Sequence, residues 1–207
     1  MKMSFVKIAS FAAISVAGAL LAGSALADDA VPARVRGAVV SLDAGKLVVH
    51  PKDGPDVTVQ LADKWSAVGV IKSSLADIKP GVFIGTASMP QTDGSLKGVE
   101  LLLFPEAMRG FAEGHYGWDV QPKSMMTNAT VAKSVEAVDG QTLTLTYKGG
   151  EQKVTIPKDA PVVTLGDATQ ADVKVGAIVF VPGNKNADGS IGANLVLVGK
   201  DGVVPPM

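Results

Sequence analysis

The sequence predicts an all-β protein built from two tandem small OB-like β-barrels. Three observations lead to this prediction. Segments of the chain recur at a nearly fixed spacing, which indicates an internal duplication. Short runs of alternating apolar residues are separated by glycine-containing turns, as in strands. Each repeat also carries one signal for a short helical turn, at the same place in its order of strands.

The duplication is clearest in two motifs. Ala76–Gly81 matches Ala171–Gly176, and Asp93–Leu96 matches Asp188–Ile191, both at a spacing of 95 residues. Upstream, three positions match at a spacing of 96, so the register slips by one residue in the intervening hairpin. These upstream pairs are Asp43 with Asp139, Leu47 with Leu143, and Val49 with Leu145.

The first repeat contains six predicted strands and one helical turn. Alternation in Val57–Leu61 places three apolar side chains on one face, as in a half-buried strand. Asp53-Gly54 marks a hairpin. Ser73-Ser74 can cap a helical turn over Leu75–Lys79, which Pro80-Gly81 ends. The expected strands are Arg34–Leu42, Leu47–His50, Val57–Leu61, Ala67–Ile71, Gly81–Met89 and Leu96–Phe104.

The second repeat follows the same order. Its helical turn is expected near Thr169–Lys174, between the fourth and fifth strands. Five or six short strands in each repeat, with one helical turn before the fifth, favour a small OB-like barrel, with a small open sandwich as the alternative. The expected strands are Thr130–Val138, Gln141–Tyr147, Gln152–Ile156, Pro161–Leu165, Ala177–Pro182 and Ser190–Val198.

Residues 1–27 have the features of a cleavable signal peptide with an N-terminal signal helix. Two lysines precede an apolar run from Ile8 to about Ala22, and Ala25-Leu26-Ala27 forms a cleavage site. A retained membrane anchor is the alternative, but this run falls short of the ~20 residues that span a bilayer. We therefore expect a periplasmic or secreted bacterial protein with no membrane span after cleavage.

The composition of the mature chain argues against several classes of protein. Loss of Lys2 and Lys7 with the signal leaves 17 basic and 20 acidic residues, a net charge of −3. A nucleic-acid partner would call for a basic surface, so none is expected. The chain has no cysteine, which excludes disulfides, thiolate nucleophiles and thiolate metal sites.

The stretch between the repeats, residues 105–129, is predicted to be a packed connector. Phe111, Tyr116 and Trp118 lie close together in it, whereas a free linker would be polar and rich in glycine or serine. The expected organisation is a signal at 1–27, a first OB-like domain at 28–104, this connector, a second OB-like domain at 130–200 and a tail at 201–207. We expect the connector to clamp both repeats into one unit.

The connector also holds the candidate site residues. Imidazole and carboxylate groups suit a divalent metal, so Glu106, Glu113, His115 and Asp119 are the candidate metal ligands. Their spacing matches no established metal motif, and the alternative is a hydrogen-bonded corner over aromatic packing. Other candidate binding residues are Arg109, Tyr116 and Trp118. No catalytic motif and no cofactor motif is found.

Three segments resemble an exported bacterial family with tandem OB-like domains of unknown function. They are Arg36–Ser41, Ala76–Gly81 and the run from Phe104 through Asp119, and the resemblance extends to the final nine residues. Some members of that family are named metal ABC transporter permeases, which conflicts with the lack of a membrane span in the mature chain. The resemblance implies the fold and supplies no activity and no assigned site.

The function expected from the sequence is that of a periplasmic binding or scaffolding protein. Its partner would be another periplasmic protein, a glycan or a small ligand. The first alternative is a metal-binding protein that uses His115 and the nearby carboxylates, and the second is an enzyme without a recognisable motif. A groove or apolar patch beside the connector would favour the first hypothesis, and convergence of His115 with carboxylates would favour the metal site.

Overall fold

The computed structural model describes residues 31–205, so the predicted signal peptide lies outside the described residues. The all-β barrel fold is confirmed. The elements, in chain order, are β1 (Val31–Asp43), β2 (Lys46–His50), β3 (Val57–Lys72), η1 (Leu75–Asp77), β4 (Phe83–Pro90), β5 (Leu96–Leu103), η2 (Glu106–Met108), β6 (Gly114–Gly117), β7 (Met125–Ala137), β8 (Gly140–Tyr147), β9 (Gly150–Pro157), β10 (Val162–Gly166), η3 (Gln170–Asp172), β11 (Ile178–Lys185) and β12 (Ile191–Gly199).

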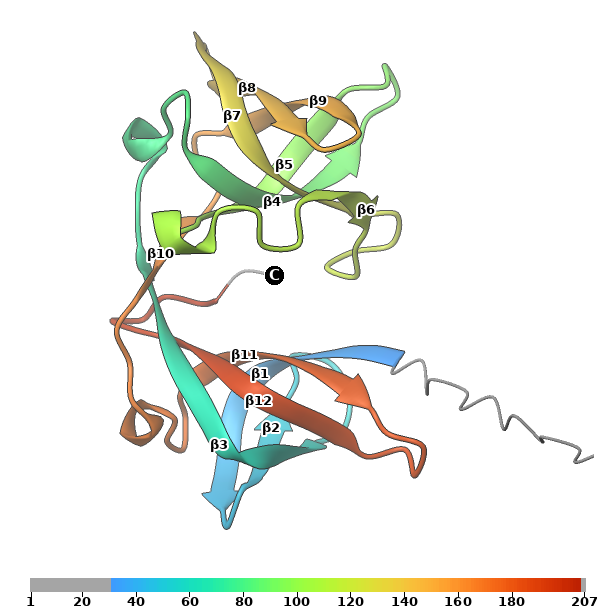
Figure 1. The fold of residues 1–207 in the computed structure, drawn as a ribbon, viewed down its shortest axis with the longest axis vertical. Coiled ribbons are helices and arrows are strands. Elements are labelled where there is room, and N and C mark those ends of the chain that lie inside the picture. The colour runs from blue at the N-terminus through green and yellow to red at the C-terminus, as the bar shows by residue number, and fades with distance from the viewer. Residues whose placement is uncertain (1–30, 206–207) are drawn as a thin grey trace, which may run out of the picture.

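The strands form two closed five-stranded barrels that lie one above the other in Figure 1. The first barrel contains β1, β2, β3, β12 and β11, and closes through antiparallel β1–β11 and parallel β3–β12 pairing. The second contains β4, β5, β9, β8 and β7, and closes through antiparallel β4–β7 and parallel β5–β9 pairing. Closure leaves neither barrel with a free sheet edge.

Each barrel therefore combines strands from both repeats. The first three strands of one repeat pair with the last two strands of the other, as the colours in Figure 1 show. The sequence-based domains at 28–104 and 130–200 are consecutive segments, and the strand pairing corrects them. The repeat had shown which strands are equivalent, but it could not show whether a strand pairs within its own repeat or across to the other.

The two repeats cross where β3 and β10 pair. The end of β3 runs antiparallel to β10, with Val70 opposite Leu165. Leu165 lies 95 positions after Val70, so each of these residues is the repeat equivalent of the other. A pseudo-twofold axis therefore passes between them, and the two crossing strands connect the barrels on the left of Figure 1.

The structure corrects the expected strand boundaries, most of all at β3 and at β7. β3 is one long strand instead of the two predicted at 57–61 and 67–71, whereas Pro157 and Pro161 separate the equivalent β9 and β10. Proline lacks the N–H group that a continuous ladder needs. β7 begins at Met125, so the connector ends earlier than 129, because residues 125–130 pair with β4. The connector also contains β6, a strand the sequence did not predict.

The helical turns lie where the sequence placed them. η1 and η3 are short 3₁₀ turns, and each begins with a capping box. In a capping box the side chain of the first residue accepts a hydrogen bond from the backbone of the fourth, and the side chain of the fourth accepts one from the backbone of the first. The pairs are Ser74 with Asp77 and Thr169 with Asp172. η1 lies between β3 and β4, and η3 lies between β10 and β11, so each turn precedes the last two strands of its repeat, where the chain passes from one barrel to the other.

Three apolar clusters stabilise the arrangement. One fills each barrel and contains mostly valine, leucine and isoleucine from the inward faces of its strands. The third lies between the barrels and combines residues of both, including Leu102, Phe104, Phe180 and Leu197. Leu102 and Leu197 are repeat equivalents, so the duplicated strands β5 and β12 meet at this interface through the same position.

The tail after β12 is fixed to η3 and to the central cluster. Lys200 Nζ donates to Asp172 Oδ1 at 2.5 Å, and the Lys200 backbone N–H donates to the Val70 carbonyl oxygen at 3.0 Å. Val203 packs against the central cluster. The bond from Lys200, helped by the Thr169 backbone N–H, lowers the pKa of the Asp172 carboxyl from 3.8 to about 2.

Strand exchange predicts that neither half of the chain folds alone. Fragment 28–110 lacks β7–β9, β11 and β12, and fragment 111–207 lacks β1–β5, so neither fragment can complete either barrel. Each fragment alone should therefore show no cooperative unfolding by circular dichroism. Mixed together, the fragments should form a 1:1 complex with the circular dichroism spectrum of residues 28–207. A fragment that unfolds cooperatively as a monomer would contradict the exchange.

The lowered pKa of Asp172 predicts an acid-sensitive contribution to stability. The unfolded chain binds a proton at this carboxyl more readily than the folded chain does, so the contribution is present above pH 3.8 and is lost as the pH falls through about 2. Urea unfolding across this range should show the gap between wild type and Asp172→Asn shrinking as the pH falls. Asp63→Asn, at an exposed site, is the control and should show no such convergence.

Candidate functional site

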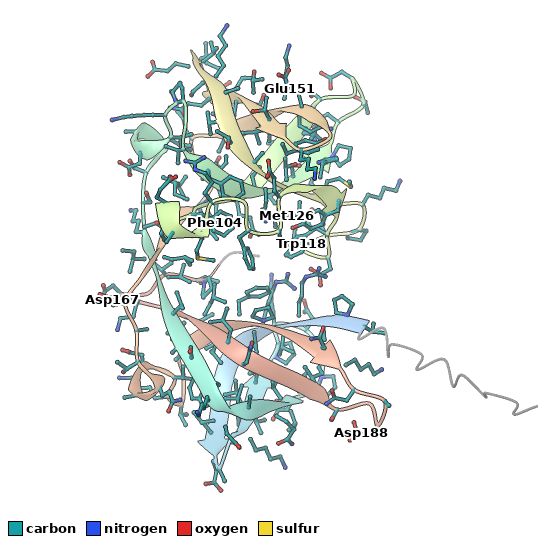
Figure 2. The ribbon with its side chains drawn as sticks, in the orientation of Figure 1. Phe104, Trp118, Met126, Glu151, Asp167 and Asp188 are labelled. Atoms are coloured by element: carbon teal, nitrogen blue, oxygen red, sulfur yellow. The ribbon has the colours of Figure 1, made fainter. Side chains whose placement is uncertain are left out.

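An apolar cavity of about 400 Å³ lies between the two barrels, beside the connector. Five aromatic side chains contribute to its wall, together with leucine and methionine side chains from both barrels. Figure 2 labels the lining residues Phe104, Trp118 and Met126, which lie on the side of the second barrel that faces the first. The aromatic lining residues are Phe104, Phe111, Tyr116, Trp118 and Phe180.

A larger hollow of about 840 Å³ borders the tail and the η1 turn. Its lining mixes two lysines, an aspartate and a glutamate with two serines and with aliphatic residues, and it contains no aromatic side chain. Ligand sites in proteins are usually lined by apolar and aromatic groups with a few polar ones. By that chemistry, the smaller cavity is the better candidate site.

The connector begins with η2, which Arg109 fixes to the second barrel. The guanidinium donates to the Gly81 carbonyl oxygen at 2.8 Å and to Thr130 Oγ1 at 3.2 Å. The guanidinium also donates to both carboxylate oxygens of Glu106, from Nε to Oε1 at 2.5 Å and from Nη2 to Oε2 at 2.6 Å. The two bonds from Arg109 lower the pKa of the Glu106 carboxyl below its usual range. Arg109 therefore positions the connector and does not line the cavity.

Asn128 joins the middle of the connector to β7. It is only 5% exposed, and its Nδ2 donates to the Phe111 carbonyl oxygen at 3.2 Å and to Tyr116 Oη at 3.3 Å. Tyr116 Oη in turn donates to the Ala112 carbonyl oxygen at 3.3 Å. Burial raises the pKa of the Tyr116 phenol, while nearby Arg34 opposes that shift. The Tyr116 ring is thereby held against the cavity.

Asn128 fits only because a glycine lies opposite it on β4. A Cβ atom at Gly85 would stand 2.6 Å from Asn128 Oδ1 and 3.0 Å from Phe104 Cε2. Real Cβ atoms do not approach neighbours that closely without displacement. Gly85 therefore leaves the space that both cavity-wall residues need.

The end of the connector contacts the first barrel. Asp119 forms ion pairs with Arg36 at 2.8 Å and with Arg34 at 3.5 Å, both on β1. The Arg34 guanidinium also lies over the Trp118 ring, 3.8 Å from its centroid. Together with the η2 contacts, these interactions attach the connector to both barrels.

Two polar atoms of the cavity-lining residues are buried without a hydrogen-bond partner among residues 31–205. They are Trp118 Nε1 and Asn128 Oδ1. Buried polar atoms without a partner are rare in folded proteins, and such local exceptions concentrate at functional sites. Their position in the wall of the cavity supports it as the candidate site.

The four predicted metal ligands do not converge, and each has a separate partner. Glu106 binds Arg109 and Asp119 binds β1, while Glu113 Oε1 accepts from the Lys148 backbone N–H at 3.1 Å. His115 Nδ1 lies 2.8 Å from Thr127 Oγ1, and burial lowers the pKa of its ring. Among residues 31–205, no three His, Asp or Glu side chains are grouped to hold a metal ion. The geometry therefore gives the hypothesis of a connector metal site no support.

Of the other predicted binding residues, Tyr116 and Trp118 line the cavity and Arg109 does not. Sequence reasoning missed Arg34 and Phe180, which come from strands of the first barrel. Arg34 and Arg36 alternate on one predicted strand, which was a signal for a charged strand face. No pattern in the sequence placed that face against the connector, because β1 and the connector belong to different barrels.

The β-bulges give the repeat alignment of the cavity walls. The β1–β2 pairing shifts between Val39 and Ser41, and the β7–β8 pairing shifts at residues 131–133. Aligning the two bulges places Val39 opposite Val131 in the alignment of the repeats. Arg34 and Met126 each lie five residues before these positions, so they are repeat equivalents, and both line the cavity. The duplicated position therefore carries a charge on one wall and a thioether on the other.

Comparison with protein-family models, with curated proteins and with solved structures found no match to this chain. Within residues 31–205, no helix has the length and apolar character needed to cross a membrane. The candidate site is therefore assigned from its geometry alone.

The fit at Gly85 predicts that Gly85→Ala destabilises the protein. Crowding against Asn128 and Phe104 should lower the free energy of unfolding by about 1–3 kcal/mol, measured by urea denaturation. Gly117→Ala is the matched control, because a Cβ atom there meets nothing within 4 Å and should cost little. In an Asn128→Ala background the cost of Gly85→Ala should fall, and equal costs in both backgrounds would refute the packing argument.

Proposed function

We propose that the mature chain is an exported binding protein that holds a small apolar molecule in the cavity between its barrels. The observation that carries this proposal is the lining, because five aromatic residues from both barrels and the connector contribute to the wall of one cavity of about 400 Å³. Cavities of this size and lining are the usual form of small-molecule sites.

The features of residues 1–27 support export to the periplasm, as the sequence analysis describes. The order of strands in each barrel, with a helical turn between the third and fourth, supports an OB-like interpretation. In this interpretation the two barrels form two walls of one site, and the connector between the repeats adds a third wall.

The chemistry of the wall supports binding over catalysis. Among the described lining residues, the titratable side chains are Arg34 and Tyr116, and the lining adds no histidine, carboxylate, lysine or serine that could act beside them as a general base or nucleophile. The remaining wall is mostly carbon, which excludes water and stabilises an apolar body by about 25 cal/mol per Å² of buried apolar surface. Such a wall is suited to retaining a molecule unchanged.

The proposal predicts that residues 28–207 bind N-phenyl-1-naphthylamine, a neutral apolar dye whose fluorescence rises in apolar surroundings. Titration should give one site per chain. In a Trp65→Phe background, the emission of the remaining Trp118 should fall as the dye binds, because Trp118 lines the cavity and Trp65 packs in the first barrel.

Filling the cavity should abolish this binding. Val68→Trp places a larger side chain at a lining position, on the face of β3 that also carries Val70 of the central cluster, and should weaken dye binding at least ~10-fold, which corresponds to ~1.4 kcal/mol. Ala137→Trp, at an exposed position near the β7–β8 turn, is the matched control and should bind as wild type does. Equal affinities of the two variants, or no dye binding by wild type, would reject the proposal.

A further inference from the structure

We infer that the ligand of this cavity is an amphipathic organic monoanion, with an apolar body between the barrels and an acidic head group on Arg34. The inference rests on the proposed function and names the class of ligand. Among the described residues that line the cavity, Arg34 is the only charged one. The occupant this selects is a small carboxylate or sulfonate with an aromatic or aliphatic body.

Arg34 is positioned to receive an anionic head group. Its side chain is 24% exposed, so it lies at the boundary between the apolar cavity and water. The Arg34 Cζ atom lies over the Trp118 ring, 3.8 Å from its centroid, and this contact restrains the guanidinium. A guanidinium donates hydrogen bonds from the N–H groups at its edges, and these are the groups that bind a carboxylate.

The ion pair with Asp119 leaves Arg34 able to bind a second anionic group. The same carboxylate lies 2.8 Å from Arg36 and 3.5 Å from Arg34, so its shorter contact is with Arg36. A ligand head group can therefore replace the longer contact while Asp119 keeps its partner on β1. Asp119 is 45% exposed, so water also compensates its charge when Arg34 turns to a ligand.

The divergence of the two repeats sets the orientation of the ligand. Met126, on the second barrel, is the repeat equivalent of Arg34 on the first, and Met126 is only 1% exposed. A charge placed against Met126 would lose its hydration without a partner, which is costly. The head group therefore lies on the β1 side and the body extends toward Met126 and Phe104.

A pair of matched probes tests the head group. 8-Anilinonaphthalene-1-sulfonate and N-phenyl-1-naphthylamine share the same aromatic body, and only the first carries an anionic group. Residues 28–207 should bind the sulfonate at least ~10-fold more tightly than the neutral dye, since a charge-assisted hydrogen bond is worth that factor or more. Raising the salt concentration should weaken binding of the sulfonate selectively.

Variants at three positions assign the effect to Arg34. Arg34→Gln should weaken sulfonate binding ~10-fold and leave the neutral dye within ~2-fold of wild type. Arg34→Lys should retain part of the preference, and Asp119→Asn should increase it by removing the competing carboxylate. Lys133→Gln, which removes an exposed charge on the second barrel, is the matched control and should change neither affinity.

The outcomes separate the two proposals. If wild type does not bind the neutral dye, the proposed function fails, whatever the sulfonate does. If it binds both equally and Arg34→Gln changes neither affinity, the cavity binds apolar molecules and the anionic head group is wrong. If Arg34→Gln weakens both dyes equally, Arg34 supports the cavity wall and the inference is again overturned. Only a selective loss of sulfonate binding supports it.

Discussion

The pairing of β3 with β10 is the constraint on which the rest of the structure depends. Each strand leaves one barrel and leads its chain toward the other, and the two meet with Val70 opposite Leu165. Because the last two strands of each repeat close the barrel begun by the other, neither barrel can form without both repeats. The exchange also fixes the distance between the barrels, and so creates the space in which the central apolar cluster and the cavity lie.

Duplication produces a nearly symmetric interface, and the function we propose depends on where that symmetry is broken. Leu102 and Leu197 keep equivalent positions at the centre, whereas Arg34 and Met126 have diverged. The connector between the repeats adds Tyr116 and Trp118 to one side of the cavity. A symmetric interface would be a packed apolar seam, and divergence together with one inserted segment turns it into a cavity with a polar end.

The connector links stability with the candidate site. Arg109 and Asn128 hold it on the second barrel, and Asp119 holds it on β1 of the first. Exposed ion pairs contribute little each, so the aromatic contacts and the buried amide of Asn128 dominate its attachment. The same contacts shape the wall, which is why Gly85, with no side chain of its own, affects both packing and the cavity.

The sequence by itself determined the all-β class, the duplication, nearly all the strands, both capped turns and the packing of an aromatic connector, because these follow from local periodicity, turn residues and composition. Tyr116 and Trp118 were recognised for the same reason. Only the tertiary structure decided that strands are exchanged, since equivalent strands satisfy the same backbone hydrogen bonds in either barrel. For that reason Arg34 and Phe180 could not be placed beside the connector, and the spread of Glu106, Glu113, His115 and Asp119 over separate partners could not be foreseen.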